Sequence, residues 1–189
     1  MLTLLSPAKK MNMDPAQTAL GATQPRFMDD TRELAKLAKT KTPADLKALM
    51  HISDNLAELN VDRFQSFNLD GQSNNAKAAG LAFDGDVYWG LEAKSLSDDA
   101  LSYAQDHLRI LSGLYGVLRP MDAIQAYRLE MGTKMINPRG KSLYEFWGLA
   151  IAENLNADLE SHSDQTIVNL ASNEYFKAVD RRALSAPVI

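Results

Sequence analysis

Residues 107–132, HLRILSGLYGVLRPMDAIQAYRLEMG, constrain the fold more than any other part of the chain. Three glycines and a proline interrupt an apolar pattern that also holds three arginines and two tyrosines. The spacing of Leu101, Ala104, Leu108 and Leu111 predicts a helix that runs into this stretch. Gly113 and the residues after it then predict a tight loop, a short helix near 121–124 and an extended run, YRLEM.

The arginines of this stretch are candidates for anion binding. Arg109, Arg119 and Arg128 carry planar guanidinium groups that suit phosphate or carboxylate. Arg128 and Glu130 are two residues apart, so on a strand both side chains project from the same face. We therefore expect Glu130 to orient Arg128 toward a cleft. The alternative is an internal salt bridge beside packed aromatic side chains.

The charge of the chain is unevenly distributed. The net charge is −4, but residues 109–144 hold 6 basic and 2 acidic residues. A basic patch on an acidic protein can steer an anion to one place. We expect a basic cleft, and the predicted anion-binding residues are Lys9, Lys10, Arg109, Arg119, Arg128, Lys134 and Lys177.

The pattern predicts a mixed α/β (α+β) fold, a helix-rich single domain over residues 1–189 with a small mixed sheet. A length of 189 residues suits one domain. The apolar runs at 1–5 and 166–170 predict buried strands. Helical spacing of apolar residues predicts helices at 28–38 and 143–155.

Residues 43–60 form a candidate helix-hairpin-helix. Thr42 and Pro43 are typical of a helix start, and a break at 51–53 precedes a second helix containing Ala57. This is the register of a DNA-binding helix-hairpin-helix, but His51 and Ser53 replace the two glycines that let a phosphate approach the turn. A plain pair of antiparallel helices is the alternative.

Several acidic and aromatic residues are candidates for acid–base chemistry. Asp86 and Tyr88 lie in FDGDVYWGL (83–91), which we interpret as a loop between glycines. Glu174 and Tyr175 follow the predicted strand at 166–170. Together with Glu130, they could serve an enzyme that acts on a nucleobase or nucleotide. The alternative for the loop is a packed surface corner.

Composition excludes several classes of chemistry. The chain has no cysteine, which rules out thiol peroxidase chemistry and cysteine-ligated metals. Its three histidines are far apart in sequence, so we expect no metal site and no cofactor, although carboxylates alone remain an option for Fe²⁺. No apolar run approaches 18 residues and no basic region precedes the apolar N-terminus. We expect a cytoplasmic protein that does not contact membranes.

Four motifs together resemble the YaaA peroxide stress resistance family. They are SPAK at 6–9, FDGDVYWGL at 83–91, the stretch at 107–132 and NLASNEYFKAV at 169–179, in that order. Lys10 and Ala126 stand where the family more often has Thr and Pro, and Asn173 replaces a frequent Asp. Family members are longer, so the chain resembles a member truncated at its C-terminus.

The resemblance implies a cytoplasmic protein that protects DNA during peroxide stress by limiting free iron. It also implies DNA binding, a mixed α/β fold, a helix-hairpin-helix and a positively charged cleft. The expected partner is therefore DNA, double-stranded or distorted. Contacts to backbone phosphate would make its affinity strongly dependent on salt.

Overall fold

The computed structural model, which describes residues 1–15, 20–71 and 75–189, is built around a four-stranded mixed sheet. The strand order is β4-β3-β1-β6. β1 is parallel to both of its neighbours, whereas β4 is antiparallel to β3. The strands are β1 (Leu2–Leu5), β3 (Leu108–Ser112), β4 (Gly116–Leu118) and β6 (Ile167–Asn169). The predicted α+β fold with a small mixed sheet is confirmed.

The parallel arrangement brings three strand ends to one side of the sheet. Leu4 of β1 lies opposite Arg109 of β3 and Asn169 of β6. The loops after Leu5, Ser112 and Asn169 therefore start at the same edge, which we call the carboxyl edge. In open α/β sheets, ligands commonly bind outside such an edge.

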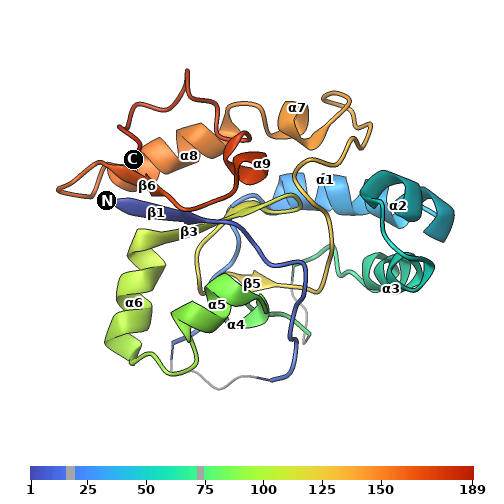
Figure 1. Cartoon of the computed structure of the whole chain (residues 1–189), viewed down its shortest axis with the longest axis horizontal. Helices are drawn as coiled ribbons and strands as arrows, with labels where there is room; N and C mark the ends of the chain where they lie inside the picture. The colour runs from blue at the N-terminus through green and yellow to red at the C-terminus, as the bar shows by residue number, and fades with distance from the viewer. Residues whose placement is uncertain (16–19, 72–74) are drawn as a thin grey trace.

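Helices pack around this sheet, and in Figure 1 α7 and α8 lie above it while α4 and α5 lie below. The longest of the described helices have 12 residues, and none of them is long and apolar enough to cross a membrane. The helices are α1 (Met28–Lys39), α2 (Pro43–Met50), α3 (Asp54–Gln65), α4 (Ala79–Ala82), α5 (Asp86–Leu91), α6 (Asp98–His107), α7 (Leu143–Trp147), α8 (Ala150–Leu159) and α9 (Asn173–Phe176).

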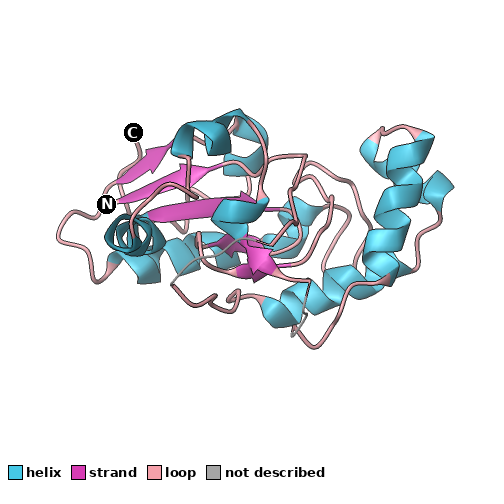
Figure 2. Ribbon diagram, turned by 90° about the horizontal axis from the view of Figure 1, so that it is seen from below, coloured by secondary structure: helices cyan, strands magenta, loops and turns pink. Residues whose placement is uncertain are grey.

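Helices α2 and α3 form a hairpin that stands apart from the sheet, as Figure 2 shows. Thr42 caps α2 in a capping box with Asp45, and Ser53 caps α3. Between them His51 adopts the left-handed conformation (φ 52°). Glycine is the usual residue there, and histidine is among the few others that tolerate this region. His51 thus adopts the conformation that glycine usually adopts at this position.

The predicted helix that ran through Leu111 is wrong in its second half. α6 ends at His107, and Leu108–Ser112 is β3, the strand between β1 and β4. A strand covered on both faces reads as a continuous apolar run, which helical spacing also fits. Pairing with β1 decides between the two.

Three further local predictions also need correction. Residues 121–124 do not form a helix; Ala123–Ile124 is β5, paired with β2 (Lys77–Ala78). Residues 86–91 form α5 rather than a loop. The predicted helix at 143–155 is two helices, because the chain turns at Gly148, which has a φ of 49°.

Close backbone packing holds the extended run YRLEM against the turn between β3 and β4. A Cβ on Gly113 would clash with the carbonyl oxygen of Leu129, and one on Gly116 would clash with the ring of Trp147. Gly116 also has a φ of +72°, which disfavours other residues. These glycines let the segment that carries Arg128 and Glu130 reach the carboxyl edge.

Candidate functional site

Hydrogen bonds between serines and tyrosines tie the carboxyl edge together. Ser6, after β1, donates its hydroxyl to Ser172 Oγ (3.3 Å), after β6, and accepts from the Ser172 backbone N–H (2.9 Å). Ser112, at the end of β3, lies 2.6 Å from the Tyr127 hydroxyl. The Tyr88 hydroxyl donates to the Ser6 carbonyl (2.8 Å). The edge is thereby a fixed polar surface.

Three buried tyrosines supply neutral hydroxyl groups at this edge. Burial raises the pKa of Tyr88, Tyr127 and Tyr175. Near Tyr175, the charges of Tyr127, Glu174 and Glu130 raise its pKa further. The phenols therefore keep their protons at neutral pH, and the hydroxyls of Tyr88 and Tyr127 serve the hydrogen bonds to Ser6 and Ser112.

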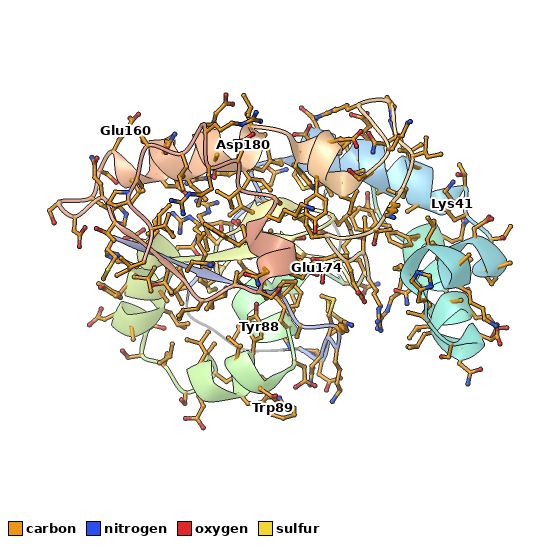
Figure 3. All side chains as sticks on the ribbon, turned by 45° about the horizontal axis from the view of Figure 1, so that its top comes forward. Lys41, Tyr88, Trp89, Glu160, Glu174 and Asp180 are labelled. Atoms are coloured by element: carbon orange, nitrogen blue, oxygen red, sulfur yellow. The ribbon has the colours of Figure 1, made fainter. Side chains whose placement is uncertain are left out.

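A groove of about 320 Å³ lies between the hairpin and the carboxyl edge. One wall is residues 48–51, at the end of α2 and the turn after it. The other wall contains Glu130, Gly132 and Lys134, and Glu174 of α9 also lines the groove. Figure 3 shows Glu174 near the middle of the molecule, on the side of α9 that faces the hairpin. We call this cavity the groove.

Two carboxylates in the groove are held in defined positions. Glu174 Oε1 accepts from the Gly132 backbone N–H at 2.8 Å. Glu130 Oε1 accepts from Arg128 Nη2 (2.8 Å) and Nε (3.2 Å) and lies 3.6 Å from Lys9 Nζ. Among the described residues, the Oε2 atom of each glutamate has no hydrogen-bond partner. Arg128 and Glu130 do pair, as both the predicted orientation toward a cleft and the alternative of an internal salt bridge require, and Arg128 is not among the residues that line the groove.

Five basic residues lie in or around the groove; among them Lys134 is the one that lines it in the described part of the chain, and Arg63 was not predicted. They are Lys9, Arg63, Arg128, Lys134 and Lys177. The guanidinium of Arg63 makes no ion pair or hydrogen bond with any residue that the structure describes. Burial, and after it the nearby charge of Arg128, lower the pKa of Arg63. A half-buried guanidinium without a counterion is suited to an anion from outside the protein.

The sequence contained a signal for Arg63 in the pattern of α3. Ala57, Asn60 and Phe64 are its buried residues, so Arg63 lies beside the buried face rather than on the solvent side. The sequence alone gives no sign that α3 lies next to Arg128, because the contact joins segments 65 residues apart.

Two further cations, Lys134 in the groove and Lys177 over the Tyr144 ring, are exposed. Lys177 Nζ lies 4.9 Å from the centre of the Tyr144 ring, whose hydroxyl donates to the Glu174 carbonyl (2.9 Å). Lys134 lines the groove directly. Both remain available to an anion because neither forms an ion pair with a described residue.

The structure places the other predicted cations outside the groove. Arg109 is buried near the amino end of β3, where Nε donates to Asp158 at 2.6 Å. Arg119 is paired with Asp122 (2.8 Å). Lys10 is paired with Asp84 (2.7 Å). The candidate acid Asp86 is exposed on α5 and does not line the groove either.

The turn of the helical hairpin is not favourable for a phosphate. Ser53 accepts from the Leu56 backbone N–H (3.4 Å) and so uses one of the free donors at the start of α3. Asp54 adds a negative charge there and pairs with Lys47 at 2.7 Å. The hairpin instead contributes Arg63 and the wall of the groove.

No metal centre is evident in the part of the chain that the structure describes. Within residues 1–15, 20–71 and 75–189, no three His, Asp or Glu side chains are grouped to hold a metal ion. His107 and His162, distant in sequence, do lie together, with ring centroids 4.7 Å apart. They are near Met1, at the opposite edge of the sheet from the groove.

A family model described as peroxide stress protein YaaA matches residues 1–189. The chain belongs to the YaaA family. It is 56% identical over 189 residues to a UPF0246 protein of Dinoroseobacter shibae, covering 100% of this chain and 70% of the relative. UPF0246 proteins of Caulobacter vibrioides and Alteromonas mediterranea are 54% and 52% identical, and in both cases the match covers 100% of this chain and 73% of the relative.

The four motifs that resemble the YaaA family meet at the carboxyl edge. Tyr88 of FDGDVYWGL hydrogen-bonds to SPAK at the Ser6 carbonyl. Lys9 of SPAK lies 3.6 Å from Glu130 of the central stretch. Gly132 of that stretch donates to Glu174 of NLASNEYFKAV. Of the four motifs, the central stretch and NLASNEYFKAV line the groove, and SPAK reaches it through the contact of Lys9 with Glu130.

Proposed function

We propose that this YaaA-family protein binds DNA through the groove and thereby helps limit iron-driven oxidative damage. The observation that carries the proposal is the half-buried Arg63, which has no counterion among the described residues and lies close enough to Arg128 for the two charges to interact. Membership of a family named for peroxide stress supports a role in the peroxide stress response. DNA phosphate is an anion that suits Arg63, and DNA is the molecule that the proposed role protects.

The residues around the groove suit phosphate rather than base edges. Arg128 is held by Glu130, so its guanidinium loses little conformational entropy when it binds an anion. Lys134 and Lys177 add exposed charges that steer a polyanion. Such contacts position a nucleic acid without reading its sequence.

The size of the groove favours distorted DNA. At about 320 Å³ it is comparable to a small-ligand pocket, which admits a nucleotide and excludes a duplex. A duplex would lie across the mouth of the groove, whereas a gap or bulge would let one backbone segment enter. We therefore propose tighter binding to gapped or bulged DNA than to intact duplex.

Phosphate binding also offers a physical route to less iron-driven damage. Cations condense along DNA, and a protein that neutralises phosphates releases them. Fe²⁺ is one such cation, and peroxide reacts with it where it is bound. Lysine and arginine side chains on the backbone would then displace Fe²⁺ from the strand that they cover.

Fluorescence anisotropy with intact, gapped and bulged duplexes over a salt series tests the proposal. If all five basic side chains contact phosphate, the slope of log K against log salt is about −4 to −5. Arg63→Gln makes the slope shallower by about one unit. Arg182→Gln is the matched control, because Arg182 is 89% exposed and pairs with Asp180. Lack of binding to every duplex at low salt contradicts the proposal.

A second candidate is an enzyme that acts on a nucleobase or nucleotide in the same groove. It is favoured because Tyr175 lies within electrostatic range of both Glu130 and Glu174. Each carboxylate has an oxygen without a hydrogen-bond partner among the described residues, and Tyr88 reaches the same edge. A positioned acid–base pair of this kind is a common catalytic arrangement.

Chromatographic analysis of products tests the enzymatic candidate. The protein is incubated with nucleosides, nucleotides and single-stranded DNA, beside a Glu174→Gln variant. Turnover that the variant loses while it still binds DNA supports an enzyme. Unchanged substrates in every mixture, or turnover that Glu174→Gln retains in full, contradict it.

A further inference from the structure

A second cavity, of about 420 Å³, lies beside α5 and outside the groove. Leu81, Phe83 and Ala93 are buried residues that give it an apolar lining. Trp89 also lines the cavity yet is 60% exposed. Figure 3 shows Tyr88 in the interior and Trp89 at the lower edge of the molecule. A lining of apolar and aromatic side chains is typical of small-molecule sites.

A hydrogen-bond network fixes the orientation of Trp89. Its indole Nε1–H donates to Asp84 Oδ1 at 2.6 Å. Asp84 Oδ2 is in turn paired with Lys10 Nζ at 2.7 Å. The polar edge of the indole is thereby satisfied, and what remains for a ligand is the face of the ring. A fixed aromatic face loses little conformational entropy when another ring stacks on it.

The residues that line this cavity include one lysine, Lys94, and two carboxylates, Asp84 and Glu92. Lys94 is exposed and forms no ion pair with a described residue. Asp84 is already bound to Lys10 and to the Trp89 indole. Lys94 is therefore the cation of the lining that can meet an anionic group on a ligand.

The backbone at the rim is held in an uncommon conformation. Glu92, which lines the cavity directly after α5, has a φ of 47°. The left-handed conformation is unfavourable for glutamate, so the surrounding packing must hold it there. This turn carries the chain from Trp89 to Lys94 and places both side chains at the same cavity.

We propose that this cavity binds a nucleobase, stacked on Trp89, with the attached phosphate near Lys94. A planar base fits an exposed ring face above an apolar lining, and a nucleotide phosphate fits Lys94, the lysine of that lining. The base can come from a free nucleotide or from an unpaired position in a DNA strand. The inference rests on the proposed function only for the second source.

Tryptophan fluorescence tests this proposal, because the chain has 2 tryptophans and Trp147 is 2% exposed. Quenching by an added base therefore reports on Trp89. The probes are dAMP, a single-stranded thymidine oligonucleotide and an abasic oligonucleotide of the same length. We expect dAMP and the thymidine oligonucleotide to quench the emission and the abasic oligonucleotide to leave it unchanged.

Substitutions of Trp89 test whether the ligand stacks on its ring. Trp89→Phe keeps an aromatic face and is expected to retain affinity for dAMP within about threefold, whereas Trp89→Leu loses about tenfold or more. Binding to the variants is followed by calorimetry, since Trp89 is then absent. Tyr103→Leu is the control, because Tyr103 is a 62% exposed aromatic residue that stacks on His107 away from this cavity.

The pattern of quenching identifies the source of the base or overturns the proposal. Quenching by dAMP alone supports the cavity and identifies a free nucleotide as the source of the base. Equal quenching by the abasic oligonucleotide, no quenching by any base, or unchanged affinity of Trp89→Leu overturns the proposal. The proposed DNA binding is judged separately, from anisotropy with the abasic oligonucleotide, which reports phosphate contacts alone.

Discussion

Replacing Arg128 by alanine should weaken DNA binding more than it weakens the fold. The Arg128 side chain is 14% exposed, and its partner Glu130 is 20% exposed. Removal of the guanidinium leaves Glu130 with Lys9 at 3.6 Å, and Lys9 is 69% exposed. Water and Lys9 can therefore solvate the carboxylate that loses its partner. This situation differs from a fully buried ion pair, in which loss of one partner costs several kcal/mol.

The size of each effect follows from these contacts. Two charge-assisted hydrogen bonds are lost, and at this exposure the cost is about 1–2 kcal/mol. For a chain of this length the melting temperature then falls by roughly 2–8 °C. One phosphate contact fewer reduces the slope of log K against log salt by about 0.9.

The assay combines thermal melts with DNA-binding curves, corrected for the folded fraction. Glu130→Gln is measured beside Arg128→Ala, because it releases the guanidinium without removing it. We expect Glu130→Gln to change binding in the same direction and by less. A large fall in melting temperature for Arg128→Ala, with unchanged binding per folded molecule, would refute the reasoning and make the pair purely structural.

Three further outcomes are expected. Arg109→Ala lowers the free energy of unfolding by about 3 kcal/mol, because buried Asp158 loses one partner and keeps only Arg26. We expect its DNA binding per folded molecule, measured by anisotropy, to be unchanged. Gly113→Ala introduces a clash with a backbone carbonyl and costs about 3 kcal/mol or more, measured from urea midpoints. Burial raises the pKa of Tyr127 above its ordinary value of about 10. The stability that the neutral Tyr127 phenol contributes is therefore full below about pH 10 and is lost as the pH rises through the raised pKa. Urea midpoints measured between about pH 8 and 11 check this.

The fold was predictable where local signals and tertiary contacts agree. The apolar runs at the strands β1 and β6 and the cap Thr42 correspond to the observed elements. The strand β3 was not predictable, because Leu108 and Leu111 fit a helix as well as a strand buried on both faces. Its pairing with β1 is a contact between segments about 100 residues apart, which no local pattern records.

The candidate site was predictable where it follows strand ends. Lys9 and Glu174 come shortly after β1 and β6, and the parallel arrangement brings such residues together. Arg109 was assigned to the same cleft only because a helix was expected to carry it there; in β3 it lies near the opposite edge. Arg63 was missed because its role depends on where the hairpin lies.

Hydrogen–deuterium exchange with and without gapped DNA tests the central claim most directly, because it locates the contact as well as detecting it. If the groove binds the backbone, DNA slows exchange in residues 48–65, 128–134 and 172–177 and leaves α6 and α8 unchanged. Slower exchange at α6 or α8, with no change around the groove, would contradict the account.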